Sequence, residues 1–237
     1  MSHFQSRWLA PALLCVLSCN TYAVDGIVLI DQNRALAGNV TPGDAPGFPV
    51  TISVPGSYRL SGNLTVPDAN TTAILVTADN VTVDLNGFSI IGPTVCVGSP
   101  VTSCSPTGSG VGVNAQSQNN VTVVNGTVRG MGGSGIVIFG MGYVEKVHAI
   151  SNGFIGISVR LGVVSGNMVI SNGYVGIDVE NGTVSGNLSA GNHSAAIEIH
   201  LCPSTVVGNT AVGNGTDFIA GGSGGGPACA VANNSPQ

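Results

Sequence analysis

The fold is decided by four short segments, which read GIVI at residues 135–138, GISV at 156–159, GIDV at 176–179 and AIEI at 196–199. Their first residues lie 21, 20 and 20 positions apart. Self-similarity at a period of about 20 residues is typical of repeat architectures, in which each unit buries its apolar face against the next. The sequence therefore predicts a solenoid.

Two columns of asparagine run through the same repeats. One holds Asn152, Asn172, Asn192 and Asn214, and the other, five positions ahead of it, holds Asn167, Asn187 and Asn209. A side-chain amide donates and accepts at once, so stacked copies can form hydrogen bonds along the solenoid axis. We expect this structural role for both columns, and we expect the glycines at 153, 173 and 215 to supply a positive φ at tight corners.

Within each repeat the apolar residues alternate and are β-branched, as in Ile157 with Val159 and Ile177 with Val179. A period of two residues is that of a strand with one buried face. Nothing in the repeat favours a helix, and leucine is too scarce for a leucine-rich repeat. Short strands that stack coil on coil predict an all-β fold with parallel sheets.

Two earlier stretches carry the same pattern, NVTVDLNG at 80–87 and NVTVVNGTVR at 120–129. Together with the Gly-Ile-x-Val and Asn-Gly coils, they resemble the right-handed parallel β-helix repeat proteins of the pectin-lyase-like superfamily. The resemblance implies a right-handed parallel β-helix solenoid. Counting coils gives about seven or eight, over residues 51–220 and with an inserted loop at 94–109.

The segments outside the repeat are expected to protect or precede the solenoid. Residues 24–50 do not follow the repeat, and we expect them to cap the open strand edge of the first coil. A Gly-rich tail, residues 221–237, follows the last coil at the other end of the solenoid. Residues 1–23 read as a secretory signal peptide cleaved after Ala23. An uncleaved anchor fits less well because the apolar run is short, whereas lipidation at Cys19 stays open.

Export places the mature chain in an oxidising compartment, so we expect a secreted or periplasmic protein with two disulfides. Cys96 and Cys104 flank one inserted loop, and Cys202 and Cys229 fall on consecutive coils, which favours these two pairs. No C-x-x-C is present, and the histidines are not spaced as a zinc motif requires. The sequence therefore predicts no metal site from its cysteines.

Composition excludes several partners. The chain has 237 residues, a 43% hydrophobic fraction, 7% charged residues and a formal net charge of −5, so it is not a charge-rich disordered chain. With Lys146 as its one lysine, it is poorly suited to nucleic acid or to an anionic membrane surface. We expect neither nucleic acid nor a membrane span, and the oligomeric state stays open.

The polar side of the aligned strands is the candidate ligand face. Ser158, Asp178 and Glu198 form one outward column, and Arg160, Glu180 and His200 form the next. Opposite charges on an exposed strand face pair as a matter of course, but few other charges exist in this chain. The predicted ligand face is therefore Arg160, Asp178, Glu180, Glu198 and His200, with no cofactor predicted and calcium left open.

Other polar and aromatic positions are interpreted as structural. Asp84 and Arg129 lie in the early coils and are expected to form hydrogen bonds in turns. Phe154 and Tyr174 share one repeat position, where they would stack in the turn or offer a platform to a sugar.

Two functions remain open, and the catalytic residues are unknown. The resemblance implies a lyase, hydrolase or epimerase acting on uronate-type polysaccharides, with Asp178 and Glu198 as its carboxylates and Arg160 or His200 in the remaining role. The paired-aspartate and Gly-His-Gly motifs of the hydrolases are missing, however, and the chain is poor in lysine. The sequence therefore favours a non-catalytic module that binds glycans, contacts envelope partners or serves as a spacer.

Overall fold

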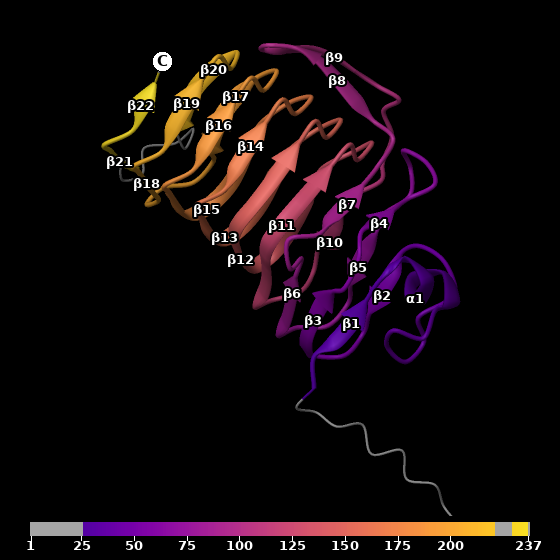
Figure 1. Cartoon of the computed structure of the whole chain (residues 1–237). Coiled ribbons are helices and arrows are strands. Elements are labelled where there is room, and N and C mark those ends of the chain that lie inside the picture. Colours follow the sequence, from indigo (N-terminus) through magenta and orange to yellow (C-terminus); the bar gives the residue numbers. More distant parts are fainter. Residues whose placement is uncertain (1–25, 221–228, 237) are drawn as a thin grey trace, which may run out of the picture.

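The computed structural model describes residues 26–220 and 229–236 and is a parallel β-solenoid of about eight coils (Figure 1). The predicted signal peptide and most of the Gly-rich tail lie outside the described residues. Successive coils stack along one axis, with the N-terminal coils and the C-terminal coils at opposite ends. The all-β solenoid predicted from the repeat is confirmed.

The strands form three parallel stacks, and each full coil gives one strand or part of a strand to each stack. The first stack contains β2 (Val50–Ile52), β5 (Ile74–Val76), β10 (Val113–Ala115), the starts of β12 (Ile136–Ile150), β13 (Ile157–Ser165) and β15 (Ile177–Ser185), then β17 (Ala195–Ile199) and β20 (Thr216–Ala220).

The second stack contains β1 (Val28–Ile30), β3 (Gly56–Leu60), β6 (Val81–Asp84), the start of β11 (Val121–Arg129), later parts of β12, β13 and β15, then β18 (Thr205–Val207) and β21 (Ala230–Ala232). The third contains β4 (Leu64–Thr65), β7 (Ser89–Ile91), the ends of β11 and β12, β14 (Met168–Ile170), β16 (Leu188–Ala190), β19 (Thr210–Val212) and β22 (Ser235–Pro236).

Equivalent residues of successive coils are register partners, so each inward column is a stack of like side chains. Ile157 pairs with Ile177, which pairs with Ile197, and all three are at most 1% exposed. Burial of these β-branched side chains removes apolar surface from water in every coil. The inward face is the one that the alternating pattern predicts.

The two asparagine columns form ladders of buried amides, as predicted. The Nδ2 atom of Asn172 donates to Asn192 Oδ1 at 2.9 Å and to the Ala149 carbonyl at 3.1 Å. Its Oδ1 atom accepts from the backbone N–H of Asn152 at 3.1 Å and from Asn152 Nδ2 at 3.0 Å. Each amide therefore satisfies the backbone N–H of the equivalent asparagine at the corner and gives a further hydrogen bond to a strand carbonyl.

The second ladder extends further than its sequence column. Asn209 Nδ2 donates to Asn234 Oδ1 at 2.9 Å, which adds one rung in the last coil. The repeat pattern did not include Asn234 because 25 residues separate it from Asn209, more than the usual spacing.

The glycines after the first ladder do not have the predicted positive φ. The residue before each asparagine takes that conformation instead, with φ of 52° at Ser151 and 55° at Ser171. At Gly173, a Cβ would lie 2.3 Å from the carbonyl oxygen of Gly153. The predicted positive φ is therefore wrong. Glycine is needed at 153, 173 and 215 because the backbone of the neighbouring coil lies too close for a side chain.

The segment before the first full coil covers the edge of the solenoid. Helix α1 (Gln32–Ala37) places Ala35, which is 0% exposed, in the core. Asp44 is 3% exposed and its carboxylate accepts from the N–H groups of Val40 at 3.0 Å and Thr51 at 2.6 Å. Thr51 lies on edge strand β2, so this contact satisfies an amide that would otherwise be open to another chain.

The solenoid also extends beyond the expected range 51–220. β1 pairs with β3 at one end, and β21 and β22 pair with β18 and β19 at the other. These outer strands belong to the second and third stacks, whereas the Gly-Ile-x-Val segments belong to the first. Their spacing also departs from the 20-residue period, since Val28 pairs with Tyr58 and Thr205 with Ala230.

The inserted loop forms a hairpin of β8 (Val95–Gly98) and β9 (Val101–Ser105) that lies across the corners of later coils (Figure 1). The Val101 N–H donates to the Gly191 carbonyl at 2.9 Å. His193 Nδ1 makes a hydrogen bond with the Val101 carbonyl at 2.6 Å. The hairpin therefore contacts coils far along the sequence from its own.

Both predicted disulfides are present. Cys96 and Cys104 pair across the hairpin with Cα atoms 4.0 Å apart, and Cys202 and Cys229 pair with Cα atoms 5.0 Å apart. The first closes the hairpin, and the second joins the last two coils. Together they leave no free thiol among the described residues.

We expect Ile177→Asp to prevent folding, because the side chain is fully buried and an ionised group there would lose its hydration without gaining a partner. Ile177→Val should cost only about 0.5 to 1.5 kcal/mol. Thr183→Asp, on the outward side of the same strand, is the control and should melt close to wild type. Thermal melts followed by circular dichroism test this, and a wild-type melting temperature for Ile177→Asp would place the strand in the other register.

We expect Asn172→Ala to destabilise the chain by several kcal/mol. The change leaves the backbone N–H of Asn152 and one of its side-chain N–H groups without their partner, at about 1 to 3 kcal/mol for each buried group. Asn214→Ala should cost less, because this last rung is partly exposed and water can replace the amide. Urea denaturation measures both costs, and equal values would argue against a buried ladder.

Candidate functional site

The predicted ligand face lies on the outside of the first stack, over β13, β15 and the end of β17. Asp178 and Glu198 are direct register partners on adjacent coils. A shallow depression of about 330 Å³ adjoins them, and its lining comprises Phe139, Ser158, Arg160, Asp178, Glu180, His200 and Leu201. The structure thus brings the five predicted residues together, with Glu198 beside the depression.

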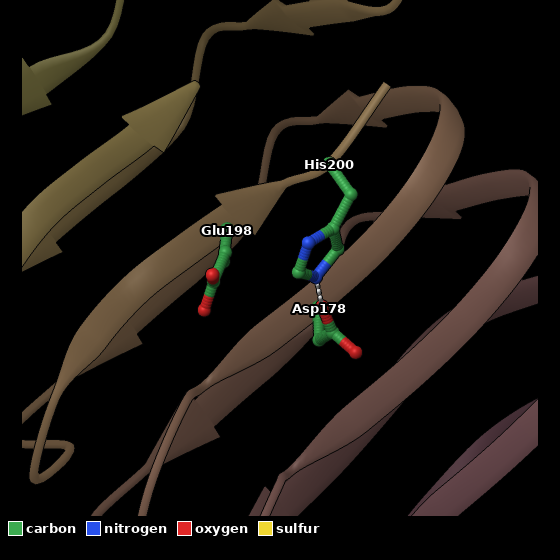
Figure 2. A group of neighbouring side chains, drawn as sticks. All are labelled: Asp178, Glu198 and His200. Atoms are coloured by element: carbon green, nitrogen blue, oxygen red, sulfur yellow. Dashed lines mark hydrogen bonds and ion pairs between the residues drawn. The ribbon is translucent and has the colours of Figure 1, made fainter. Parts of the chain in front are cut away.

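Asp178 is the centre of the hydrogen bonds at this face. Its Oδ1 atom lies 2.5 Å from His200 Nε2, and its Oδ2 atom accepts from Ser158 Oγ at 2.9 Å (Figure 2). The Asp178 side chain is 19% exposed, whereas that of His200 is 49% exposed. The carboxylate is therefore held in place, while the imidazole faces solvent.

A separate ion pair occupies the neighbouring column. Arg160 Nε lies 2.7 Å from Glu180 Oε2, and their side chains are 57% and 36% exposed. Such an exposed pair contributes little to stability. It does, however, engage the one arginine of this face, so that Arg160 does not offset the charge of Asp178 or Glu198.

Glu198 has no such partner. Within residues 26–220 and 229–236, no hydrogen bond or ion pair reaches its carboxylate. The sequence contains no Lys, Arg or His after His200. Glu198 therefore stands next to Asp178 with a like charge, and His200 is the neighbouring side chain that could offset it.

Three residues of this face differ from expectation. Ser158 is on the outward column but only 3% exposed, because it lies in register between Val137 and Asp178 and gives its hydroxyl to Asp178. Phe139 and Leu201, 45% and 47% exposed, line the depression and were not predicted. Phe139 occupies the repeat position of Arg160, directly after two alternating apolar residues, so the repeat could have placed it on this face.

The site brings together groups with two chemical capacities. A histidine hydrogen-bonded to a carboxylate is the arrangement of an oriented general base. One donor atom from each of Asp178, Glu198 and His200 lies within 4.8 Å of the others, so the same residues could hold a metal ion. The repeat predicts that these three residues share a face, but not that the His200 side chain turns toward Asp178, because a repeat does not specify rotamers.

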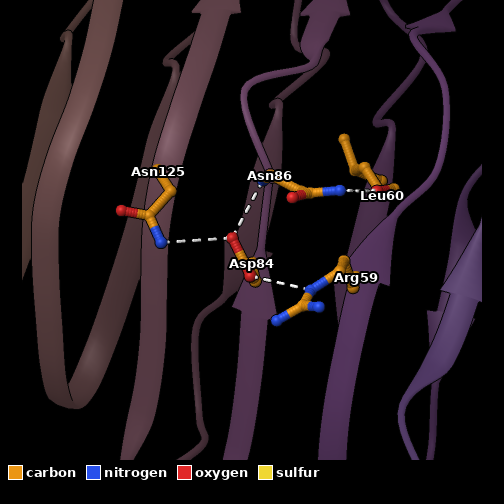
Figure 3. Close-up of polar contacts among 5 residues, drawn as sticks. All are labelled: Arg59, Leu60, Asp84, Asn86 and Asn125. Carbon is orange, nitrogen blue, oxygen red and sulfur yellow. Dashed lines mark hydrogen bonds and ion pairs between the residues drawn. The ribbon is translucent and has the colours of Figure 1, made fainter.

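The other polar cluster of interest has a structural role. Asp84 Oδ2 lies 2.9 Å from Arg59 Nε, while Oδ1 accepts from the Asn86 N–H at 2.9 Å and from Asn125 Nδ2 at 3.3 Å (Figure 3). These bonds join three coils and occupy both carboxylate oxygens. The expected role of Asp84 in turns is confirmed, whereas no side-chain hydrogen bond of Arg129 is found among the described residues.

Phe154 and Tyr174 stack on each other, as one of the two interpretations predicts. Their ring centroids are 5.1 Å apart with an interplanar angle of 4°. The residues are 48% and 41% exposed, so the pair remains accessible at the solenoid corner.

Comparison with known proteins gives no relative. Searches of family models, of curated proteins and of solved structures found no match to this chain. Among the described residues, no helix has the length and apolar character needed to cross a membrane.

We expect Glu198→Gln and Glu180→Gln to shift stability in opposite directions. The first removes a carboxylate opposite Asp178 and should stabilise, because like charges directly opposite each other are unfavourable. The second removes the partner of Arg160 and should destabilise. Each change should amount to about 0.2 to 1 kcal/mol. Denaturation at low salt with a chelator measures them, and destabilisation by Glu198→Gln would show that its charge has a partner.

Proposed function

We propose that this chain is a secreted or periplasmic β-solenoid that binds a glycan, without transforming it, at the face of Arg160, Asp178, Glu180, Glu198 and His200. The observation that supports the proposal is the depression at this face, where hydrogen-bonding groups and the exposed Phe139 and Leu201 line one surface. A sugar presents hydroxyl groups and an apolar ring face, and it needs both kinds of contact.

Charge favours a neutral glycan over a uronate polymer. Three carboxylates (Asp178, Glu180 and Glu198) against one guanidinium (Arg160) leave this face with a formal charge of −2 when His200 is neutral. Carboxylates accept hydrogen bonds from sugar hydroxyls, but they repel an anionic polymer. The uronate substrates implied by the pectin-lyase-like resemblance therefore fit this face poorly unless a cation binds first.

The openness of the site favours binding over catalysis. Enzyme sites exclude water to strengthen the electrostatic interactions inside them. Here the depression is shallow, and the His200 side chain is 49% exposed. The two disulfides are compatible with an extracellular location, where a rigid glycan-binding or envelope-contacting module would operate.

A polysaccharide-active enzyme is the second candidate, because His200 and Asp178 form a hydrogen-bonded pair beside Glu198. In this function His200 or Glu198 would abstract a proton and Arg160 would stabilise charge on the substrate. Incubation with uronate and neutral oligosaccharides tests it. Unsaturated products or new reducing ends would establish the enzyme, whereas unchanged oligosaccharides that bind would support the module.

We expect the double variant Asp178→Asn, Glu198→Gln to lose glycan binding at least tenfold, because the charged acceptors are gone while shape is kept. A glycan array with the wild-type chain identifies the ligand, and calorimetry compares the variants. Its melting temperature should equal or exceed that of wild type. Glu145→Gln, away from this face, is the control and should bind normally. Unchanged binding by the double variant would remove this face from the proposal.

A further inference from the structure

We propose that Asp178, Glu198 and His200 form a site for one divalent transition-metal ion of the zinc class on the outside of the solenoid. The inference does not depend on glycan binding, since it rests on the three side chains alone. It also departs from the sequence analysis, which predicted no metal site and left only calcium open.

The fold places the three ligands by two simple rules. Asp178 and Glu198 are register partners, so their strands are held one coil apart. His200 follows Glu198 by two positions, and alternation along a strand puts both side chains on one side. Figure 2 shows the side chains of Asp178 and His200 meeting, with that of Glu198 beside them on the strand that leads to His200.

The distances fit an ion after a small adjustment of side chains. One donor atom of each residue already lies within 4.8 Å of the other two. Around a tetrahedral zinc ion, with ligand distances near 2.1 Å, donor atoms stand about 3.4 Å apart. The carboxylate of Glu198 and the imidazole of His200 lie at the surface, so a rotation that moves their ends by about an ångström closes the site.

The donor set selects the class of ion. Calcium and magnesium take oxygen ligands almost exclusively, whereas imidazole nitrogen suits zinc, copper and nickel. One imidazole with two carboxylates therefore favours a transition metal over calcium. Three protein ligands also leave the fourth tetrahedral position to water or to an oxygen atom of another molecule.

The negative charge of Asp178 and Glu198 favours binding of a divalent cation at this face. Arg160 is paired with Glu180, and no cationic residue follows His200 in the sequence. Asp178 and Glu198 together carry a charge of −2, which one divalent ion offsets. The ion would replace the hydrogen bond between His200 Nε2 and Asp178 Oδ1.

Ser158 provides the support that metal ligands usually have. The residue is buried, and its hydroxyl donates to Asp178 Oδ2 at 2.9 Å. This bond fixes the carboxylate so that Oδ1 faces His200. Outer hydrogen bonds of this kind orient the ligating atom and raise metal affinity.

The test uses the purified chain with both disulfides intact, stripped with chelator and titrated with zinc sulfate by calorimetry. We expect one zinc ion per chain, and a higher melting temperature when zinc is present. His200→Gln and Asp178→Asn should each weaken zinc binding at least tenfold. Glu145→Gln and His148→Gln are the matched controls, a carboxylate and an exposed histidine away from this face, and both should bind zinc as wild type does.

Three results would overturn the proposal. The first is less than one zinc ion per wild-type chain at saturation. The second is zinc affinity in His200→Gln equal to that of wild type, in protein whose circular dichroism shows it folded. The third is tighter binding of calcium than of zinc, which would indicate that only oxygen atoms, and not the His200 imidazole, bind the ion.

Discussion

The whole structure depends on one constraint, that each residue must meet its equivalent in the next coil one strand spacing away. The asparagine ladders enforce it, because an amide such as Asn187 can reach Asn167 and Asn209 together only when the coils return to the same position. Coils of unequal length obey the same rule. Their extra residues lie outside the ladders, as at the shift in register between Ile138 and Met141.

Much of the fold could be predicted because a solenoid converts sequence period directly into contact. The inward isoleucines, the ladders and both disulfides follow from residue spacing alone. The pattern did not predict that the residue before each asparagine has the positive φ. It also did not predict that glycine is required at 173 because two backbones approach closely there. Outer strands such as β1 were also missed, because the spacing to the next coil departs from the 20-residue period, as between Val28 and Tyr58.

The candidate site was predictable in its columns and not in its details. The columns of Asp178 with Glu198 and of Glu180 with His200 follow from the repeat. The burial of Ser158 and the contact between Asp178 and His200 depend on side-chain rotamers, which a repeat does not specify. The same stacking that suits isoleucine inside forces carboxylates together outside. On a globular surface two such groups could turn apart, but here their strands fix them one coil apart.

The hairpin of β8 and β9 changes how the coils depend on one another. In a simple solenoid each coil touches only its neighbours, so stability is a sum of local terms and the ends can fray independently. This hairpin leaves the stack before β10 and contacts Gly191 and His193. Val101 and His193 are 92 residues apart in the sequence. The coils in between cannot open outward without releasing the hairpin. We therefore expect the disulfide-closed hairpin to make the middle coils unfold together, and unfolding to begin in the coils that it does not cover.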